Sequence, residues 1–229
     1  MALPKLEVPT FETQLPSSKK VVKYRPFLVK EHKILLMLAE GTASDITKVV
    51  VDLVNACTFG KIKADELAFF DLVHLFVLLR KASIGEMLQL NVNCECGNQI
   101  EYTANLNDVK VDLNPKHEAR IRLNRQIAID MRYPVLAESI EAYSQAGQEV
   151  DLAIACIKGI HEGNEYHDVR ENSADELRAF IEDMNSAQFE KIRDFFITMP
   201  KISLPVNTQC PKCNKVHDLA IEGLDHFFV

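Results

Sequence analysis

The chain has 229 residues, of which 47% are hydrophobic, and a formal net charge of −7. This length and apolar content are sufficient for a buried core and exclude disorder as the default interpretation. The negative charge argues against broad binding to nucleic acid or to an anionic membrane, because both need a basic protein surface.

The cellular location is suggested by what the sequence lacks. The N-terminus has no apolar stretch long enough for a signal peptide, and LAFFDLVHLFVLLR (67–80) contains charged residues and is too short to span a bilayer. We therefore expect a soluble protein in a reducing cytoplasm. In that compartment, clustered cysteines are more often metal ligands or redox groups than structural disulfides.

The first part of the chain predicts a hairpin and three helices: 9–15 with 21–29, then about 30–41, 45–57 and 64–81. The third helix is apolar on nearly every side. A helix of this kind lies in a core or is covered by a partner. Its Phe69 and Phe76 are therefore candidate partner-binding residues.

The middle of the chain predicts two strand pairs. Residues 86–106 alternate apolar and polar side chains around a turn that carries Cys94 and Cys96. A second, tightly joined pair is expected at 119–123 and 126–133.

From Pro134 the chain is mostly helical, with helices expected at about 135–145, 149–159, 173–184 and 186–198 and a small hairpin at 160–168. Ser173 and Glu176 form a capping-box pattern at the start of one helix. The last segment repeats the order strand, cysteine turn, strand, with Cys210 and Cys213 in the turn.

These elements predict an α+β protein of mixed helices and antiparallel β-hairpins with a helical second half. We divide it into residues 1–133 and 134–229 and expect the two parts to form one compact unit. The segments 70–106 and 189–224 share the order apolar helix, strand, cysteine turn, strand. This weak internal repeat leaves a duplication open.

Cys94, Cys96, Cys210 and Cys213 are the candidate ligands of a structural zinc ion. Structural zinc takes four ligands, commonly four cysteines presented by two short turns. The second pair has the usual two-residue spacing, whereas the first pair is one residue tighter. Two hairpin tips that face each other would pool four thiolates and leave no open position for catalysis.

Two alternatives to zinc stay open: a site that keeps its thiols without metal, and a redox or disulfide role. A thioredoxin-type CxxC lies at a helix N-terminus, whereas the residues after Cys213 are strand-like. His217 is a further candidate ligand, although an exposed strand residue is its simpler interpretation. Cys57 and Cys156 lie on apolar helical stretches and are interpreted as buried small hydrophobic residues.

The sequence contains no phosphate-binding glycine loop, GxSxG motif or kinase-type motif. His161 and His167 lack the HExxH spacing and are interpreted as part of a solvated turn. Asp71 lies on the apolar helix and needs a partner if it is buried. The basic spot around Arg25 is interpreted as a solvated edge or a protein contact.

Three long segments carry a resemblance to a known family: LPKLEVPTFETQLPSSKKVVKYRPFLVKEHKILLM, LVHLFVLLRKASIGEMLQLNVNCECGN and FIEDMNSAQFEKIRDFFITMPKISLPVNTQCPKCNKVHDLAIEGLDHFF. The chain resembles the T4-like bacteriophage baseplate hub subunit family. The resemblance implies a non-enzymatic structural or assembly protein of the central hub of a contractile tail. It implies contacts with other phage tail and baseplate hub proteins and no nucleic acid, membrane or small-molecule substrate. It also implies a location in the host cytoplasm during assembly or in the virion tail baseplate.

The apolar C-terminus adds Phe227 and Phe228 to the candidate partner-binding residues, because an apolar chain end is normally tucked in or docked. An alternative function uses the same cysteines. It is a free-standing zinc-ribbon adaptor that binds a regulatory protein through an exposed ribbon surface.

Overall fold

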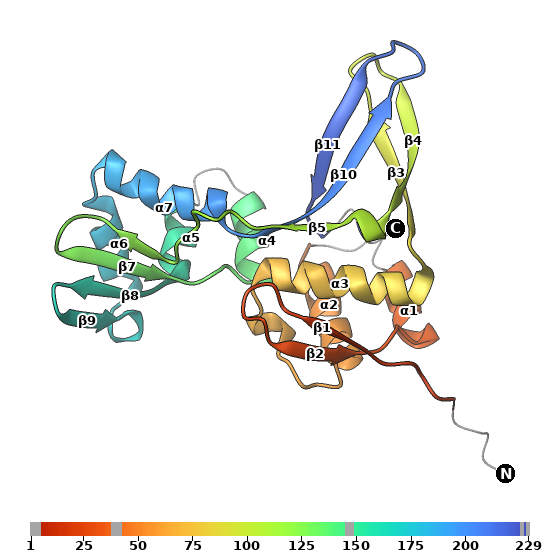
Figure 1. The fold of residues 1–229 in the computed structure, drawn as a ribbon. Coiled ribbons are helices and arrows are strands. Elements are labelled where there is room, and N and C mark those ends of the chain that lie inside the picture. Colours follow the sequence, from red (N-terminus) through yellow and green to blue (C-terminus); the bar gives the residue numbers. More distant parts are fainter. Residues whose placement is uncertain (1–5, 38–42, 145–148, 225–226, 228–229) are drawn as a thin grey trace. The chain divides into compact units, whose positions relative to one another are not determined.

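The protein is described by a computed structural model, which defines residues 6–37, 43–144, 149–224 and 227 (Figure 1). Within these residues the chain combines helices with antiparallel strands, which confirms the predicted α+β class. The α-helices are α1 (Val29–Met37), α2 (Ala43–Cys57), α3 (Phe69–Ile84), α4 (Leu136–Ser144), α5 (Glu149–Cys156), α6 (Ala174–Glu182) and α7 (Ser186–Thr198).

The strands form antiparallel sheets of two to four strands. They are β1 (Phe11–Gln14), β2 (Val21–Tyr24), β3 (Met87–Asn93), β4 (Gln99–Asn105), β5 (Lys110–Asp112), β6 (Arg120–Arg122), β7 (Ile127–Met131), β8 (Ile157–Glu162), β9 (Glu165–Asp168), β10 (Lys201–Gln209) and β11 (Val216–Glu222). None of the described helices is long and apolar enough to cross a membrane.

The chain divides into two compact units. The first comprises residues 1–112 and 201–229, and the second comprises 113–200. This division differs from the one at residue 133 that the sequence suggests. The reason is that β10 pairs with β5 and so returns the last segment of the chain to the first unit.

The core of the first unit is built around α3. Most of its apolar side chains are buried by the chain itself, and Phe76 is only 1% exposed. Asp71 is also buried, and its carboxylate accepts hydrogen bonds from the backbone N–H of Ser17, at 2.9 Å, and from the Ser17 hydroxyl. His74 contacts Thr13 Oγ1 at 3.1 Å. Asp71 and His74 therefore have partners in the β1–β2 hairpin.

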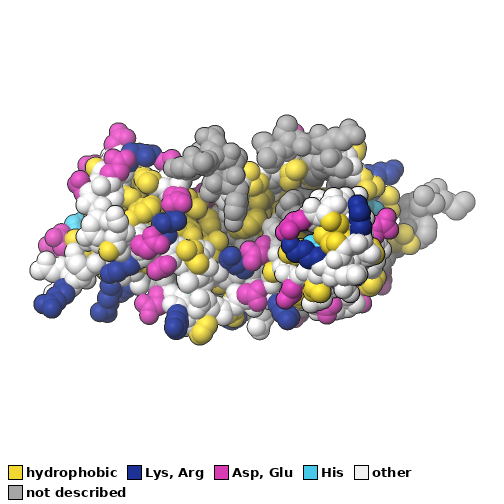
Figure 2. All heavy atoms as spheres, turned by 90° about the horizontal axis from the view of Figure 1, so that it is seen from above, with side chains coloured by type: hydrophobic (Ala, Val, Ile, Leu, Met, Phe, Trp, Pro, Cys, Tyr) yellow, Lys and Arg dark blue, Asp and Glu magenta, His cyan; other side chains and the backbone are white. Residues whose placement is uncertain are grey.

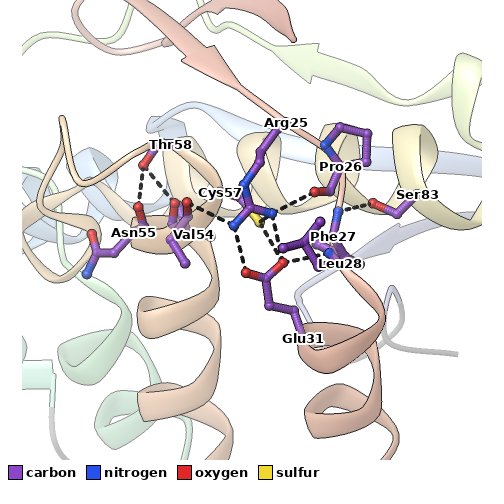
Figure 3. A network of polar contacts seen from close by, with 11 residues as sticks. Arg25, Pro26, Phe27, Leu28, Glu31, Val54, Asn55, Cys57, Thr58 and Ser83 are labelled. Atoms are coloured by element: carbon purple, nitrogen blue, oxygen red, sulfur yellow. Dashed lines mark hydrogen bonds and ion pairs between the residues drawn. The ribbon is translucent and has the colours of Figure 1, made fainter. Parts of the chain in front are cut away.

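Arg25 lies in a buried network rather than on a solvated edge (Figure 3). Its guanidinium donates two hydrogen bonds to the Glu31 carboxylate, at 2.7 and 2.8 Å. Glu31 also accepts the backbone N–H of Leu28 at 2.6 Å. The network joins the end of β2 to α1 and, through the Arg25 N–H bond to the Cys57 carbonyl, to the end of α2.

The second unit has a four-stranded sheet in the order β6-β7-β8-β9, packed with helices around buried Ile129, Ile192 and Phe195. The capping box expected at Ser173 is present, and Asn185 forms a second one at α7. The helix expected over 149–159 ends earlier, at Cys156, because the following residues form β8, which pairs with β7.

The histidines of the β8–β9 hairpin contact carboxylates of the same sheet. His161 contacts Asp130 at 2.8 Å, and Asp130 also accepts from Arg120 at 2.6 Å. The hydrogen bond from Arg120 is the main reason that the pKa of Asp130 falls to about 2. These contacts fasten neighbouring strands of one sheet to each other.

Candidate metal centre

Two β-hairpins of the first unit carry the four candidate cysteines. β3 pairs with β4, and β10 pairs with β11, each over seven residue pairs. The hairpins lie side by side with adjacent tips (Figure 1). Beneath the tips, Val92 and Ile100 of one hairpin pack with Val206 of the other in a small apolar cluster that includes Cys94 and Cys210. The alternating strand pattern thus aims one apolar face of each hairpin at the other.

Each tip is a tight turn that folds over its first cysteine. In the first tip, the N–H of Gly97 donates to the carbonyl of Cys94 at 2.9 Å. In the second tip, the N–H of Asn214 donates to the carbonyl of Cys210 at 2.9 Å. Gly97 and Asn214 both adopt positive φ, at 78° and 59°, a region that favours Gly and Asn.

The four cysteine sulfurs lie within 4.8 Å of one another. Across the tips, Cys94 Sγ lies 3.5 Å from Cys213 Sγ, and Cys96 Sγ lies 3.6 Å from Cys210 Sγ. A tetrahedral zinc site with bonds of about 2.3 Å separates its sulfurs by about 3.8 Å. The observed spacing fits such an ion with small adjustments. It is too long for a disulfide, whose sulfurs are about 2.05 Å apart.

The electrostatics of the cluster favour a limited number of thiolates. Burial opposes ionisation of Cys210, but the N–H groups of Cys213 and Lys212 and the neighbouring thiols outweigh it and lower its pKa to about 6. The N–H of Cys96 favours the Cys94 thiolate, but burial and the neighbouring sulfurs raise the pKa of Cys94 to about 12. Adjacent negative charges repel, so a full set of four thiolates needs a cation.

Polar contacts also connect the two tips. Lys215 of the second tip pairs with Glu95 of the first at 2.6 Å. The side-chain amide of Asn98 donates to Cys210 Sγ at 3.7 Å. Figure 2 views the protein from above the orientation of Figure 1 and shows basic and acidic side chains interspersed on the face in view. The charge of Lys215 would partly offset the negative charge of four metal-bound thiolates.

His217 differs from the exposed strand residue expected from the sequence. It is only 9% exposed, and its Nε2 has no hydrogen-bond partner. It is not part of the four-sulfur group. Its position opposite Thr208 turns it inward, because strand residues alternate between faces.

The predicted partner-binding residues occupy different environments. Phe76 and Phe227 are buried at 1% and 0% exposure, so they belong to the core and do not form a surface. Phe69 is half-buried, and Phe228 lies outside the described residues. Cys57 and Cys156 are buried as expected, and burial raises the pKa of each to about 12.

Sequence reasoning missed the two contacts that connect the tips, made by Lys215 and Asn98. Both residues are ordinary turn residues in the sequence, and their partners lie more than one hundred positions away. No local pattern could have indicated them. The four cysteines were detectable because clustering of a rare residue is visible without any knowledge of the fold.

The described residues thus define an α+β protein with a four-cysteine cluster between two hairpins. They contain no other group of three or more His, Cys, Asp or Glu side chains placed to hold a metal. Residues 8–229 match the model of the family described as "T4 bacteriophage base plate protein", and the chain belongs to that family.

A curated relative has a more specific description. The chain is 27% identical over 210 residues to the "Baseplate hub assembly protein gp26" of Enterobacteria phage T4. The aligned region covers 91% of this chain and 93% of that protein. No solved structure is a significant match.

Proposed function

We propose that this protein is a non-enzymatic assembly protein of the phage baseplate hub and acts through contacts with other tail proteins. The observation that carries the proposal is the match to a hub assembly protein along nearly the whole of both chains. It acts where the baseplate is built, in the host cytoplasm. A free-standing zinc-ribbon adaptor does not account for this match, because most of the matched residues lie outside the cysteine hairpins.

We further propose that Cys94, Cys96, Cys210 and Cys213 hold one structural zinc ion. The sulfur spacing and the N–H groups directed at Cys210 support this assignment. A bound divalent ion would neutralise the thiolates and cross-link the two tips. Because the cysteine pairs are more than one hundred residues apart in the sequence, closing this loop restricts the unfolded chain and stabilises the fold.

Helix α1 carries exposed large apolar side chains. Val29, Leu36 and Met37 are 75%, 65% and 81% exposed. Their spacing places them on one face of the helix. Exposed large apolar side chains grouped in this way are typical of protein-interaction surfaces. We propose that this face contacts another baseplate hub protein.

Disruption of the gene in its phage tests the function. A phage with an early stop codon in this gene should produce no hub-containing baseplates in electron micrographs of infected cells. The wild-type chain supplied from a plasmid should restore them. Normal baseplates without the protein would refute the assembly role.

A further inference from the structure

The first half of the chain contains a buried brace with five defining contacts (Figure 3). The N–H of Arg25 donates to the carbonyl of Cys57 at 3.0 Å, which ties the end of a strand to the end of the second helix. The guanidinium of Arg25 pairs with Glu31 and donates to the carbonyl of Pro26 at 2.9 Å. Glu31 also accepts from the backbone N–H of Leu28.

The second half of the chain contains the same five contacts. The N–H of Arg132 donates to the carbonyl of Cys156 at 2.8 Å. The guanidinium of Arg132 pairs with Glu138 at 2.5 and 2.9 Å and donates to the carbonyl of Tyr133 at 3.2 Å. Glu138 also accepts from the backbone N–H of Val135 at 2.9 Å.

The two braces share an Arg and a Glu at the same spacing as well as the same contacts. The segments are RPFLVKE (25–31) and RYPVLAE (132–138), with the same spacing from Arg to Glu. In each case the Glu lies in the first helix after a β-hairpin, and the contacted carbonyl belongs to a cysteine that ends the second helix. Matching spacing, residue type and hydrogen-bond partner at five contacts is what two copies of one module would have.

The elements around the braces follow the same order. In both halves a two-strand hairpin leads into a helix pair, a third helix and a cysteine hairpin: β1–β2, α1, α2, α3, β3–β4, and β6–β7, α4, α5, α7, β10–β11. The second half adds β8, β9 and α6 between its second and third helices. An aromatic ring one or two residues after each Arg packs near a Phe of the third helix, with ring centroids 6.3 Å apart for Phe27 and Phe76 and 5.7 Å apart for Tyr133 and Phe195.

The cysteine tips are equivalent despite their different spacing. In each tip the second cysteine directly precedes the residue with positive φ, Gly97 or Asn214. That residue donates its N–H to the carbonyl of the first cysteine in both turns. The N–H of the first cysteine then bonds the carbonyl of Asn98 or Lys215, where the turn closes. The CxC tip is therefore a one-residue-shorter form of the CxxC tip.

We infer that the chain consists of two copies of one module, and that the cysteine hairpin of each copy is the surface through which one module binds the other. The occupant of each surface is the equivalent hairpin of the second copy, as the sulfur contacts and the shared apolar cluster show. The repeat does not depend on metal binding. The contribution of metal to the pairing rests on the zinc site proposed above.

The exposed residues 113–116 separate the two copies and allow a direct test. A specific protease site inserted after Asn114 permits cleavage of the folded, full-length protein. In the presence of zinc, the two fragments should co-elute in equal amounts from a sizing column. In the variant with Cys94→Ser and Cys210→Ser, the association should weaken by more than about tenfold.

Each outcome decides one part of the inference. Separation of the wild-type fragments overturns the pairing surface, whereas unchanged association of the serine variant overturns the contribution of the cysteines to it. The zinc content of the same samples distinguishes the two proposals: wild-type fragments that associate without zinc support the pairing and refute the metal site. None of these results depends on tail proteins, so the assembly role is tested separately.

The repeat has its own test by hydrogen exchange of the full-length chain. Glu31→Gln should accelerate exchange of the amides in α1 and α2, and Glu138→Gln should do the same in α4 and α5. Each variant should leave the other copy's helix pair at the wild-type rate. If Glu138→Gln leaves α4 and α5 unchanged, the braces are not equivalent and the two-copy inference fails.

Discussion

The buried ion pair of Arg25 and Glu31 leads to a quantitative prediction for Glu31→Gln. The Arg25 and Glu31 side chains are only 13% and 9% exposed. Glutamine keeps the shape and one acceptor, but it leaves the guanidinium charge without its counter-charge inside the protein. Removal of one partner from a buried pair costs about 3–5 kcal/mol, and we expect about 3 kcal/mol here.

The Lys63–Glu66 pair supplies a matched control, because its side chains are 73% and 64% exposed. Glu66→Gln should change the free energy of unfolding by less than about 0.5 kcal/mol. Urea unfolding followed by circular dichroism measures both variants, and hydrogen exchange assigns the loss to α1 and α2. Equal stability of the two variants would refute the reasoning.

The effect of Glu31→Gln should also depend on pH. The hydrogen bond from Arg25 lowers the pKa of Glu31 below its ordinary value of 4.5, although burial opposes the shift. The stabilisation by the carboxylate is therefore fully present above that value and is lost as the pH falls through the lower folded-state pKa. The difference between wild type and variant should stay constant from about pH 6 to 8 and shrink in acid.

Variants at three further positions test other parts of the structure. Asp71→Asn keeps an acceptor for Ser17 and should change the free energy of unfolding by less than about 1 kcal/mol at pH 7, because burial raises the pKa of Asp71 and disfavours its charge. Asp71→Ala removes the acceptor and should cost about 2 kcal/mol in urea unfolding. Equal losses in the two variants would contradict this reasoning. Asp130→Asn should destabilise the second unit at neutral pH. The difference in stability between wild type and variant should disappear as the pH falls from 3.8 towards about 2, where wild-type Asp130 loses its charge. A difference that persists in thermal melts at pH 2 would be inconsistent with pairing to Arg120. Leu36→Lys should leave the melting temperature within a few degrees of wild type but reduce baseplate assembly in plasmid complementation, and full complementation would remove α1 as the contact surface.

Much of the fold follows from local patterns. The capping box at Ser173 and the strand alternation before Cys94 are short-range signals, and the structure contains the corresponding helix and hairpin. The three-residue strand β5 has no such signal, since its existence depends on pairing with Lys201–Ser203. That pairing also determines which unit contains the last hairpin. The boundaries of the two units could therefore not be predicted from the order of the elements along the sequence.

The four-cysteine site, too, could be predicted only in part from the sequence. Four cysteines in two clusters predict a shared site, but only the packing of the hairpins shows that the sulfurs meet. Arg25 looked like a surface cation because its basic neighbours dominate the local sequence. Its burial depends on the position of α2, which the sequence does not reveal. Phe227 was expected to be either tucked in or docked to a partner, and it is buried within the first unit.

The zinc content of the purified chain tests the central structural proposal most directly. Native mass spectrometry of the tagged protein from infected cells should show one zinc ion per chain, and alkylation of the native protein should spare the four tip cysteines. The variant with all four changed to serine should bind no zinc. A metal-free wild-type chain whose tip thiols react freely would contradict the proposed site and leave the two hairpins joined by packing alone.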